Sequence, residues 1–282
     1  MTSFGCPYNC SFCGNEQLRR VKHFKMIRRS VEGCIEELKV LKERGMRYVL
    51  FVDDIFTVDT NWLGDFLDHY NRSIGLPFAC FGHPKYLGEA IVRKLKEAKC
   101  HTIWIGIQSG DERLRKDILN RPESNQEIID ACKLVKSNGI KLMVDHIFGI
   151  PTESAMSQDI SYNLYEEIKP DVINCYELLY FPKAKIIEHA IKAAYLFPAD
   201  VEKINQGKGV TYQVGNKHQQ FYNEYAKSFV AIPIGGLWTE LLPMILLKTI
   251  VHLKAGRAFM FWVIVQNEIY FTLQAIRKKI LR

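Results

Sequence analysis

The sequence predicts an α/β protein built on a parallel sheet, and two observations support this class. Of the 282 residues, 48% are hydrophobic and 24% are charged, as in ordinary globular proteins, so disorder is not expected. From residue 30 to about residue 195, short apolar runs alternate with segments of helical periodicity. This alternation is typical of strands that are each followed by a helix. We expect about six such units over 1–195 and a mainly helical accessory region over 196–282.

Each element is predicted from its own signals. The first helix is expected to begin after Ser30, a good N-cap, because the apolar residues that follow share one helical face. Ser124 and Glu127 form a capping-box pattern that opens a later helix. Strands are expected at 1–3, 48–52, 78–81, 102–105, 141–148 and 172–178. The remaining helices are expected at 62–70, 87–98, 124–138, 157–168 and from 186 onward.

Three cysteines near the start of the chain carry the clearest chemical signal. The spacing C-x3-C-x2-C of Cys6, Cys10 and Cys13 supplies three thiolates to a four-iron cluster and leaves the fourth iron open. Zinc is disfavoured because it needs a fourth ligand nearby, and the first downstream candidates are His23 and Cys34. A disulfide is disfavoured because no secretory signal precedes the motif and one thiol would stay unpaired. We therefore expect a reducing, cytoplasmic compartment.

With Phe12 directly before the third cysteine, this motif resembles the radical S-adenosylmethionine (SAM) superfamily. In that family the open iron binds the amino and carboxylate groups of SAM. Residues 2–7, Thr-Ser-Phe-Gly-Cys-Pro, are similar to the branch that carries a cobalamin-binding domain, which includes class B methyltransferases and an anaerobic porphyrin cyclase. The resemblance implies a partial (β/α)6, TIM-like barrel with its site at the carboxyl ends of the strands.

The resemblance also implies cofactor contacts at the first of these strand ends. It places Phe12 against the adenine of SAM, although a loop aromatic could simply anchor the turn. Asp53 and Asp54 follow a predicted strand, where the family often contacts the SAM amino group. One of the two could instead cap the next turn.

Two later segments match the family's pattern at further strand ends. Residues 106–110, Gly-Ile-Gln-Ser-Gly, are similar to the family's Gly-Ile-Glu-Ser-Gly, so Gln108 and Ser109 are expected to reach ribose or carboxylate. Gln108 keeps an acceptor oxygen but lacks the charge of the usual Glu. Gly149 and Pro151 lie in a turn that resembles the family's adenine-binding segment. Departures such as His83, where relatives often have Arg, mean that the substrate cannot be inferred from the family.

The net charge of +7 favours anionic ligands, but no compact basic stripe with aromatics predicts nucleic-acid binding. The expected partners are a small-molecule or lipid-like substrate and a reductase, flavodoxin or ferredoxin as electron donor. Two apolar stretches, 237–253 and 258–276, approach the length of a membrane span, yet polar residues such as Lys248 and Glu268 interrupt them. We expect helices that cover the barrel or rest on a membrane surface.

The expected function is reductive cleavage of SAM at a [4Fe-4S] cluster to a 5'-deoxyadenosyl radical, followed by methylation or another modification of an unactivated carbon. A methylthiotransferase and a truncated, noncatalytic iron–sulfur module stay open as alternatives. Residue 1 falls inside the expected first strand, so we expect a truncated chain. A cobalamin domain on another polypeptide and an enzyme without cobalamin are the other interpretations.

Overall fold

The computed structural model describes residues 1–15, 26–208 and 210, which belong to one compact unit of the chain. A five-stranded sheet forms its centre, and every neighbouring pair of its strands is parallel. The strands follow one another in sequence order: β3 (Val49–Phe51), β4 (Phe78–Gly82), β5 (Cys100–Gln108), β6 (Lys141–Phe148) and β7 (Val172–Glu177). This order places all their carboxyl ends at one edge, as the sequence predicts.

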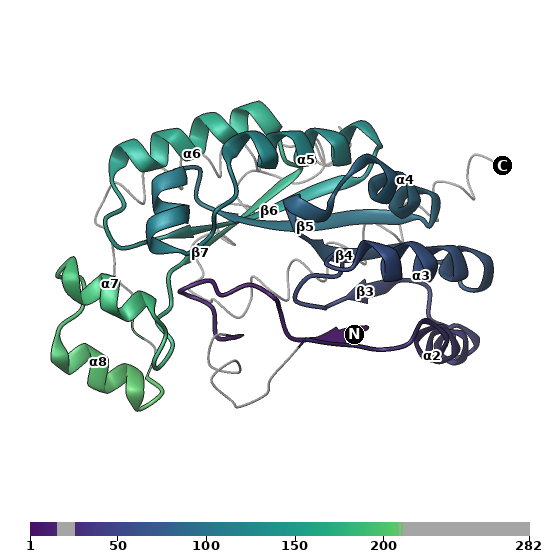
Figure 1. The fold of residues 1–282 in the computed structure, drawn as a ribbon, viewed down its shortest axis with the longest axis horizontal. Helices are drawn as coiled ribbons and strands as arrows, with labels where there is room; N and C mark the ends of the chain where they lie inside the picture. Colours follow the sequence, from purple (N-terminus) through teal and green to yellow (C-terminus); the bar gives the residue numbers. More distant parts are fainter. Residues whose placement is uncertain (16–25, 209, 211–282) are drawn as a thin grey trace, which may run out of the picture. The chain divides into compact units, whose positions relative to one another are not determined.

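Helices connect successive strands and cover one face of the sheet (Figure 1). Parallel neighbours require such crossovers, which return the chain to the starting edge. Ser30 caps the first helix by accepting a hydrogen bond from the Gly33 amide at 3.2 Å. Ser124 and Glu127 form the predicted capping box. The helices are α2 (Val31–Glu43), α3 (Thr60–Ser73), α4 (Glu89–Glu97), α5 (Asn125–Ser137) and α6 (Ala155–Ile168).

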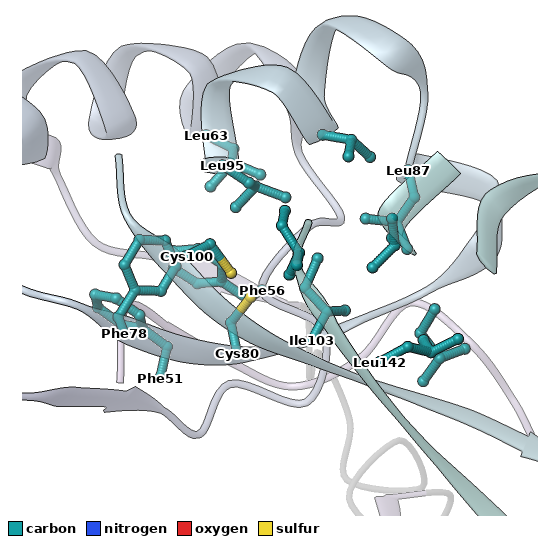
Figure 2. Packing of buried hydrophobic residues seen from close by; sticks show 14 of the residues in the cluster. Phe51, Phe56, Leu63, Phe78, Cys80, Leu87, Leu95, Cys100, Ile103 and Leu142 are labelled. Carbon is teal, nitrogen blue, oxygen red and sulfur yellow. The ribbon is translucent and has the colours of Figure 1, made fainter. Parts of the chain in front are cut away.

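Aromatic and aliphatic side chains fill the layer between these helices and the sheet (Figure 2). The ring of Phe51 stacks on Phe56 with centroids 4.5 Å apart and meets Phe78 edge-on at 5.3 Å. Leu63 and Leu95 contribute from the helices and are fully buried. Burying each such side chain contributes about 1.5–3 kcal/mol, so this layer holds the strand ends in place.

The expected first strand is corrected by the structure. Instead of joining the parallel sheet, β1 (Ser3–Phe4) pairs antiparallel with β2 (Ile27–Arg28) in a separate two-stranded sheet. Asp53 holds β1 beside the end of β3, because its Oδ1 accepts hydrogen bonds from Thr2 and Ser3. A polar side-chain contact therefore takes the place of the expected strand pairing.

Two short helices, α7 (Ile186–Lys192) and α8 (Pro198–Asn205), follow the sheet and share a second hydrophobic cluster with Leu114 and Leu119. The expected boundary between 195 and 196 stays a prediction, and the apolar stretches 237–253 and 258–276 lie outside the described residues. In the part of the chain that the structure describes, no helix combines the length and apolar character needed to cross a bilayer. A five-residue π-helix, η2 (Leu114–Ile118), was not predicted.

Candidate functional site

The three-cysteine loop is attached to the connection that follows β5. The Ser11 amide donates to the Leu119 carbonyl at 3.0 Å, and the Asn120 side chain donates to the Asn9 carbonyl at 2.6 Å. On its other side, the Ile186 amide at the start of α7 donates to the Ser11 carbonyl at 3.0 Å. The loop is thus held at the carboxyl edge of the sheet, where parallel α/β proteins bind ligands.

The donor set of this loop fits an iron–sulfur cluster. All eight cysteines lie in the described part of the chain, and none forms a disulfide. Cys6, Cys10 and Cys13 are each half-buried and close enough to influence one another electrostatically. Among the described residues, no group of His, Cys, Asp or Glu side chains is arranged for a single metal ion. The fit therefore rests on three reduced thiols of one loop, the ligand type that iron–sulfur clusters require.

Burial raises the pKa of Cys10 to about 11, with the neighbouring Cys13 and Cys6 adding to the shift and Arg121 opposing it. The thiol therefore carries a proton at neutral pH in the metal-free protein. Because the thiolate is the metal ligand, iron binding at this residue must displace that proton. Arg121 lies where a positive charge assists this step.

Phe12 and the acidic pair occupy different surroundings. Phe12 packs, partly buried, against the second hydrophobic cluster. Asp53 is fully buried, its Oδ1 is used by Thr2 and Ser3, and its Oδ2 has no hydrogen-bond partner among the described residues. Asp54 is exposed. A ligand ammonium could thus reach Asp54 directly, whereas one oxygen of Asp53 already accepts hydrogen bonds from Thr2 and Ser3. The SAM contacts of Phe12, Asp53 and Asp54 stay predictions.

A fully buried arginine shapes the turn after β5. Gln108 ends the strand in a left-handed backbone conformation with φ of 71°. Arg115 in η2 donates to the Ser109 carbonyl at 2.6 Å and to the Asn125 side chain at 2.6 Å. Gly110 packs against the backbone of Ser161 in α6, leaving no room for a side chain. The turn that contains Gln108 and Ser109 is therefore rigidly supported, and both side chains are buried there, Ser109 completely. Their roles toward SAM stay predictions.

The turn after β6 is closed by its own carboxylate. Gly149 has a φ of 77°, and its amide donates to Glu153 Oε2 at 2.7 Å. Burial raises the pKa of Glu153 to about 7, although hydrogen bonds from Gly149 and Ile150 oppose the shift. Because the Gly149 amide is engaged and Pro151 has no N–H, adenine binding at this turn would depend on carbonyl groups. That role stays a prediction.

Sequence reasoning missed a buried polar group beside the cysteine loop. The Tyr8 ring stacks on His83 with centroids 4.3 Å apart and 12° between the planes. His83 Nε2 lies 2.5 Å from Glu123 Oε1, and Arg121 lies 3.3 Å from the same oxygen. The signals in the sequence were an aromatic residue within the cysteine spacing and a histidine where relatives often have Arg.

A second missed group lies along β4 to β7. Asp145 and Asn174 face each other on β6 and β7, and their side chains are hydrogen bonded at 3.0 Å. Burial raises the pKa of Asp145, and this hydrogen bond opposes the shift. Phe81 and Trp104 stack on the neighbouring strands with centroids 5.4 Å apart. An alternating polar and aromatic pattern on these strands could have indicated this face.

The fold and the loop together define a parallel α/β protein with a thiol site at the ends of its strands. Residues 1–160 match the model of the Radical SAM superfamily, so the chain belongs to that family of enzymes, which use a [4Fe-4S] cluster and SAM. The family assignment confirms the resemblance seen in the sequence.

Known proteins similar to the chain are longer than it is. An uncharacterized methyltransferase of Pyrococcus horikoshii is 28% identical over 193 residues, which cover 68% of this chain and 41% of that protein. A hopanoid C-2 methylase of Rhodopseudomonas palustris is 26% identical over 211 residues, covering 72% of this chain and 39% of the relative. The chain therefore spans about two fifths of these curated relatives.

A solved structure supports the fold. The radical SAM methyltransferase TsrM of Kitasatospora setae, with cobalamin and a [4Fe-4S] cluster bound, superposes with a TM-score of 0.61 at 19% sequence identity. The match covers 69% of this chain and 37% of that one. This likeness confirms the expected α/β, TIM-like class of fold.

Proposed function

We propose that this chain is the catalytic barrel of a radical SAM enzyme that modifies an unactivated carbon, most simply by methylation. The observation that carries the proposal is the loop of three reduced, half-buried cysteines held at the carboxyl edge of a parallel sheet. When bound there, the cluster and SAM supply reductive cleavage of SAM and a 5'-deoxyadenosyl radical. The methyl-transferring relatives described above support methylation as the outcome.

The residues of the chain have distinct tasks in this proposal. Cys6, Cys10 and Cys13 hold the cluster and leave one iron for SAM. Asp54 is an exposed acceptor for the SAM ammonium, and Gln108 offers an uncharged acceptor for ribose. These groups bind and orient the cofactor within reacting distance of the substrate, which lowers the entropic part of the barrier.

The polar face of β6 and β7 is the proposed substrate side. Asp145 and Asn174 offer hydrogen-bonding groups there, and Trp104 of the neighbouring strand β5 pairs with Met143, two residues before Asp145. Such a face suits a small molecule with both polar and apolar parts. Cobalamin is the proposed methyl carrier, and a reductase, flavodoxin or ferredoxin is the proposed electron donor.

SAM cleavage tests the proposal directly. The protein is reconstituted anaerobically with iron and sulfide, reduced with dithionite, and assayed by chromatography for 5'-deoxyadenosine. We expect the nucleoside from the wild type and none from a Cys6→Ala, Cys10→Ala, Cys13→Ala variant. The matched control is Cys132→Ala, a buried cysteine of α5 that is expected to leave cleavage intact. A cluster that assembles without cleaving SAM would favour the noncatalytic alternative.

Product mass then separates the two transfer reactions. With cobalamin added and a substrate found, methyl transfer adds about 14 Da, because one C–H becomes C–CH3, and methylthio transfer adds about 46 Da. The larger mass increase would show that the enzyme is a methylthiotransferase and not a methyltransferase.

A further inference from the structure

Tyr8, between the first two cysteines, makes contacts that the proposed cofactor chemistry does not use. Its ring lies parallel to the His83 imidazole at 4.3 Å, and its hydroxyl donates to Tyr86 Oη at 3.2 Å. Both partners follow β4, so Tyr8 joins the cysteine loop to the mouth of that strand. A stacked aromatic pair of this kind is a specific, directional contact.

His83 is itself held from several sides. Its backbone amide donates to the Thr57 hydroxyl at 3.2 Å, and its Nδ1 accepts from the Lys85 amide at 3.3 Å. Because Nδ1 is an acceptor, the ring proton lies on Nε2, which faces Glu123 Oε1 at 2.5 Å. Glu123 is in turn paired with Arg121 at 3.3 Å. The imidazole therefore cannot turn without breaking buried polar contacts.

The electrostatics agree with a neutral ring beside a charged carboxylate. Burial lowers the pKa of His83, although Glu123 opposes the shift. Burial raises the pKa of Glu123, but the hydrogen bond to His83 and the charge of Arg121 outweigh it and lower the value to about 2. At neutral pH, Nε2 of a neutral His83 thus faces the charged carboxylate of Glu123 at 2.5 Å.

We propose that Tyr8, His83 and Glu123 are positioning residues that set the geometry of the cysteine loop before the cluster binds. The inference rests on the proposed function, since it assigns the three thiols to the cluster. It adds a third attachment to those made by Asn120 and by the start of α7. Together they hold the loop from β4, from the connection after β5 and from α7. Residues that orient metal ligands in this way affect metal binding although they do not touch the metal.

Thiol reactivity in the metal-free protein tests the geometry without needing the cluster. We compare Tyr8→Leu and His83→Gln with the wild type, with Tyr8→Phe as the conservative rescue and Tyr162→Leu on the exposed side of α6 as control. Alkylation of the three loop cysteines by iodoacetamide is followed by peptide mass spectrometry. Buried Cys34 and Cys132 report in the same samples whether the fold is intact.

We expect about twofold to tenfold faster alkylation in Tyr8→Leu and His83→Gln, the factor that corresponds to losing one aromatic stack. Neither change alters the charge near the thiols, because His83 is neutral. Tyr8→Phe keeps the ring and is expected to behave like the wild type, as is Tyr162→Leu. In reconstituted protein, the same two disruptive variants should shift the cluster's midpoint potential and its electron paramagnetic resonance spectrum.

Each result has a defined meaning. Wild-type alkylation rates in both disruptive variants, with Cys34 and Cys132 protected, would overturn the positioning role. If Cys34 becomes alkylated in Tyr8→Leu, that variant has lost its fold, and the comparison of His83→Gln with the wild type alone tests the positioning role. Faster alkylation in the variants together with a wild type that binds no iron would leave the positioning role standing and remove the proposed function.

Discussion

At the scale of residues, the turn after β6 contains a carboxyl group with an unusual protonation state. Glu153 is 7% exposed and accepts a hydrogen bond from the Gly149 amide, and its pKa is raised to about 7, chiefly by burial. In the unfolded chain this carboxyl would lose its proton near its ordinary value of 4.5. The folded protein therefore retains a proton there that the unfolded chain releases between about pH 4.5 and 7.

This difference predicts a pH-dependent effect of Glu153→Gln. The folded state binds more protons than the unfolded chain in that window. The stabilisation that the protonated Glu153 gives to the folded state is therefore fully present below pH 4.5, and it declines by about 3 kcal/mol as the pH rises through 7. The free energy of unfolding of the wild type, relative to Glu153→Gln, should thus be lower at pH 7.5 than at pH 4.5. Urea denaturation at both pH values measures it.

Glu167→Gln serves as the control, since Glu167 is a surface residue paired with Lys133 at 2.7 Å. Its replacement is expected to change stability by less than about 1 kcal/mol at either pH. An equal difference between wild type and Glu153→Gln at pH 4.5 and pH 7.5 would contradict the raised pKa.

At the scale of elements, close packing of the turn after β5 against α6 positions Gln108 and Ser109. Gly110 donates its amide to the Ser161 hydroxyl at 2.8 Å, and a Cβ on Gly110 would overlap the Ser161 backbone. The helix cannot yield there by a rotamer change, because the obstructing atoms are main chain. Only glycine fits at position 110, because the turn and α6 lie too close together for a side chain.

Gly110→Ala is accordingly expected to lower the free energy of unfolding by about 1–3 kcal/mol through overpacking. Gly64→Ala is the matched control, because a Cβ on Gly64 meets only the flexible Lys94 side chain, at 3.7 Å, and the residue lies inside α3, where alanine is favoured. Thermal unfolding followed by circular dichroism compares them. Equal melting temperatures for the two variants would show that the turn can move away from α6.

At the scale of the whole molecule, the cysteine loop connects distant parts of the chain. Near the N-terminus it accepts hydrogen bonds from Asn120 and Ile186, and its Tyr8 ring contacts His83. A ligand that bridges Cys6, Cys10 and Cys13 would bind the folded arrangement and not the unfolded chain. Cluster binding should therefore stabilise the whole unit.

Removal of iron is expected to lower the melting temperature of the reconstituted protein, because ligand binding to the native state alone raises stability by mass action. Anaerobic thermal unfolding before and after treatment with a strong chelator measures the change. The Cys6→Ala, Cys10→Ala, Cys13→Ala variant should melt at the same temperature with and without chelator. An unchanged melting temperature in the wild type would contradict cluster binding to the folded state alone.

The sequence by itself determined the order of the five parallel strands and of the helices between them, the caps at Ser30 and Ser124, and the three cysteines. These features depend on periodicity and on contacts within a few residues, so they can be predicted locally. Only the tertiary structure decided that residues 3–4 pair with residues 27–28 outside the parallel sheet and that Tyr8 contacts His83. It also decided that Arg115 is fully buried. Such pairings join residues far apart in sequence, and the physical reason they escape prediction is that strand topology, not local preference, brings them together.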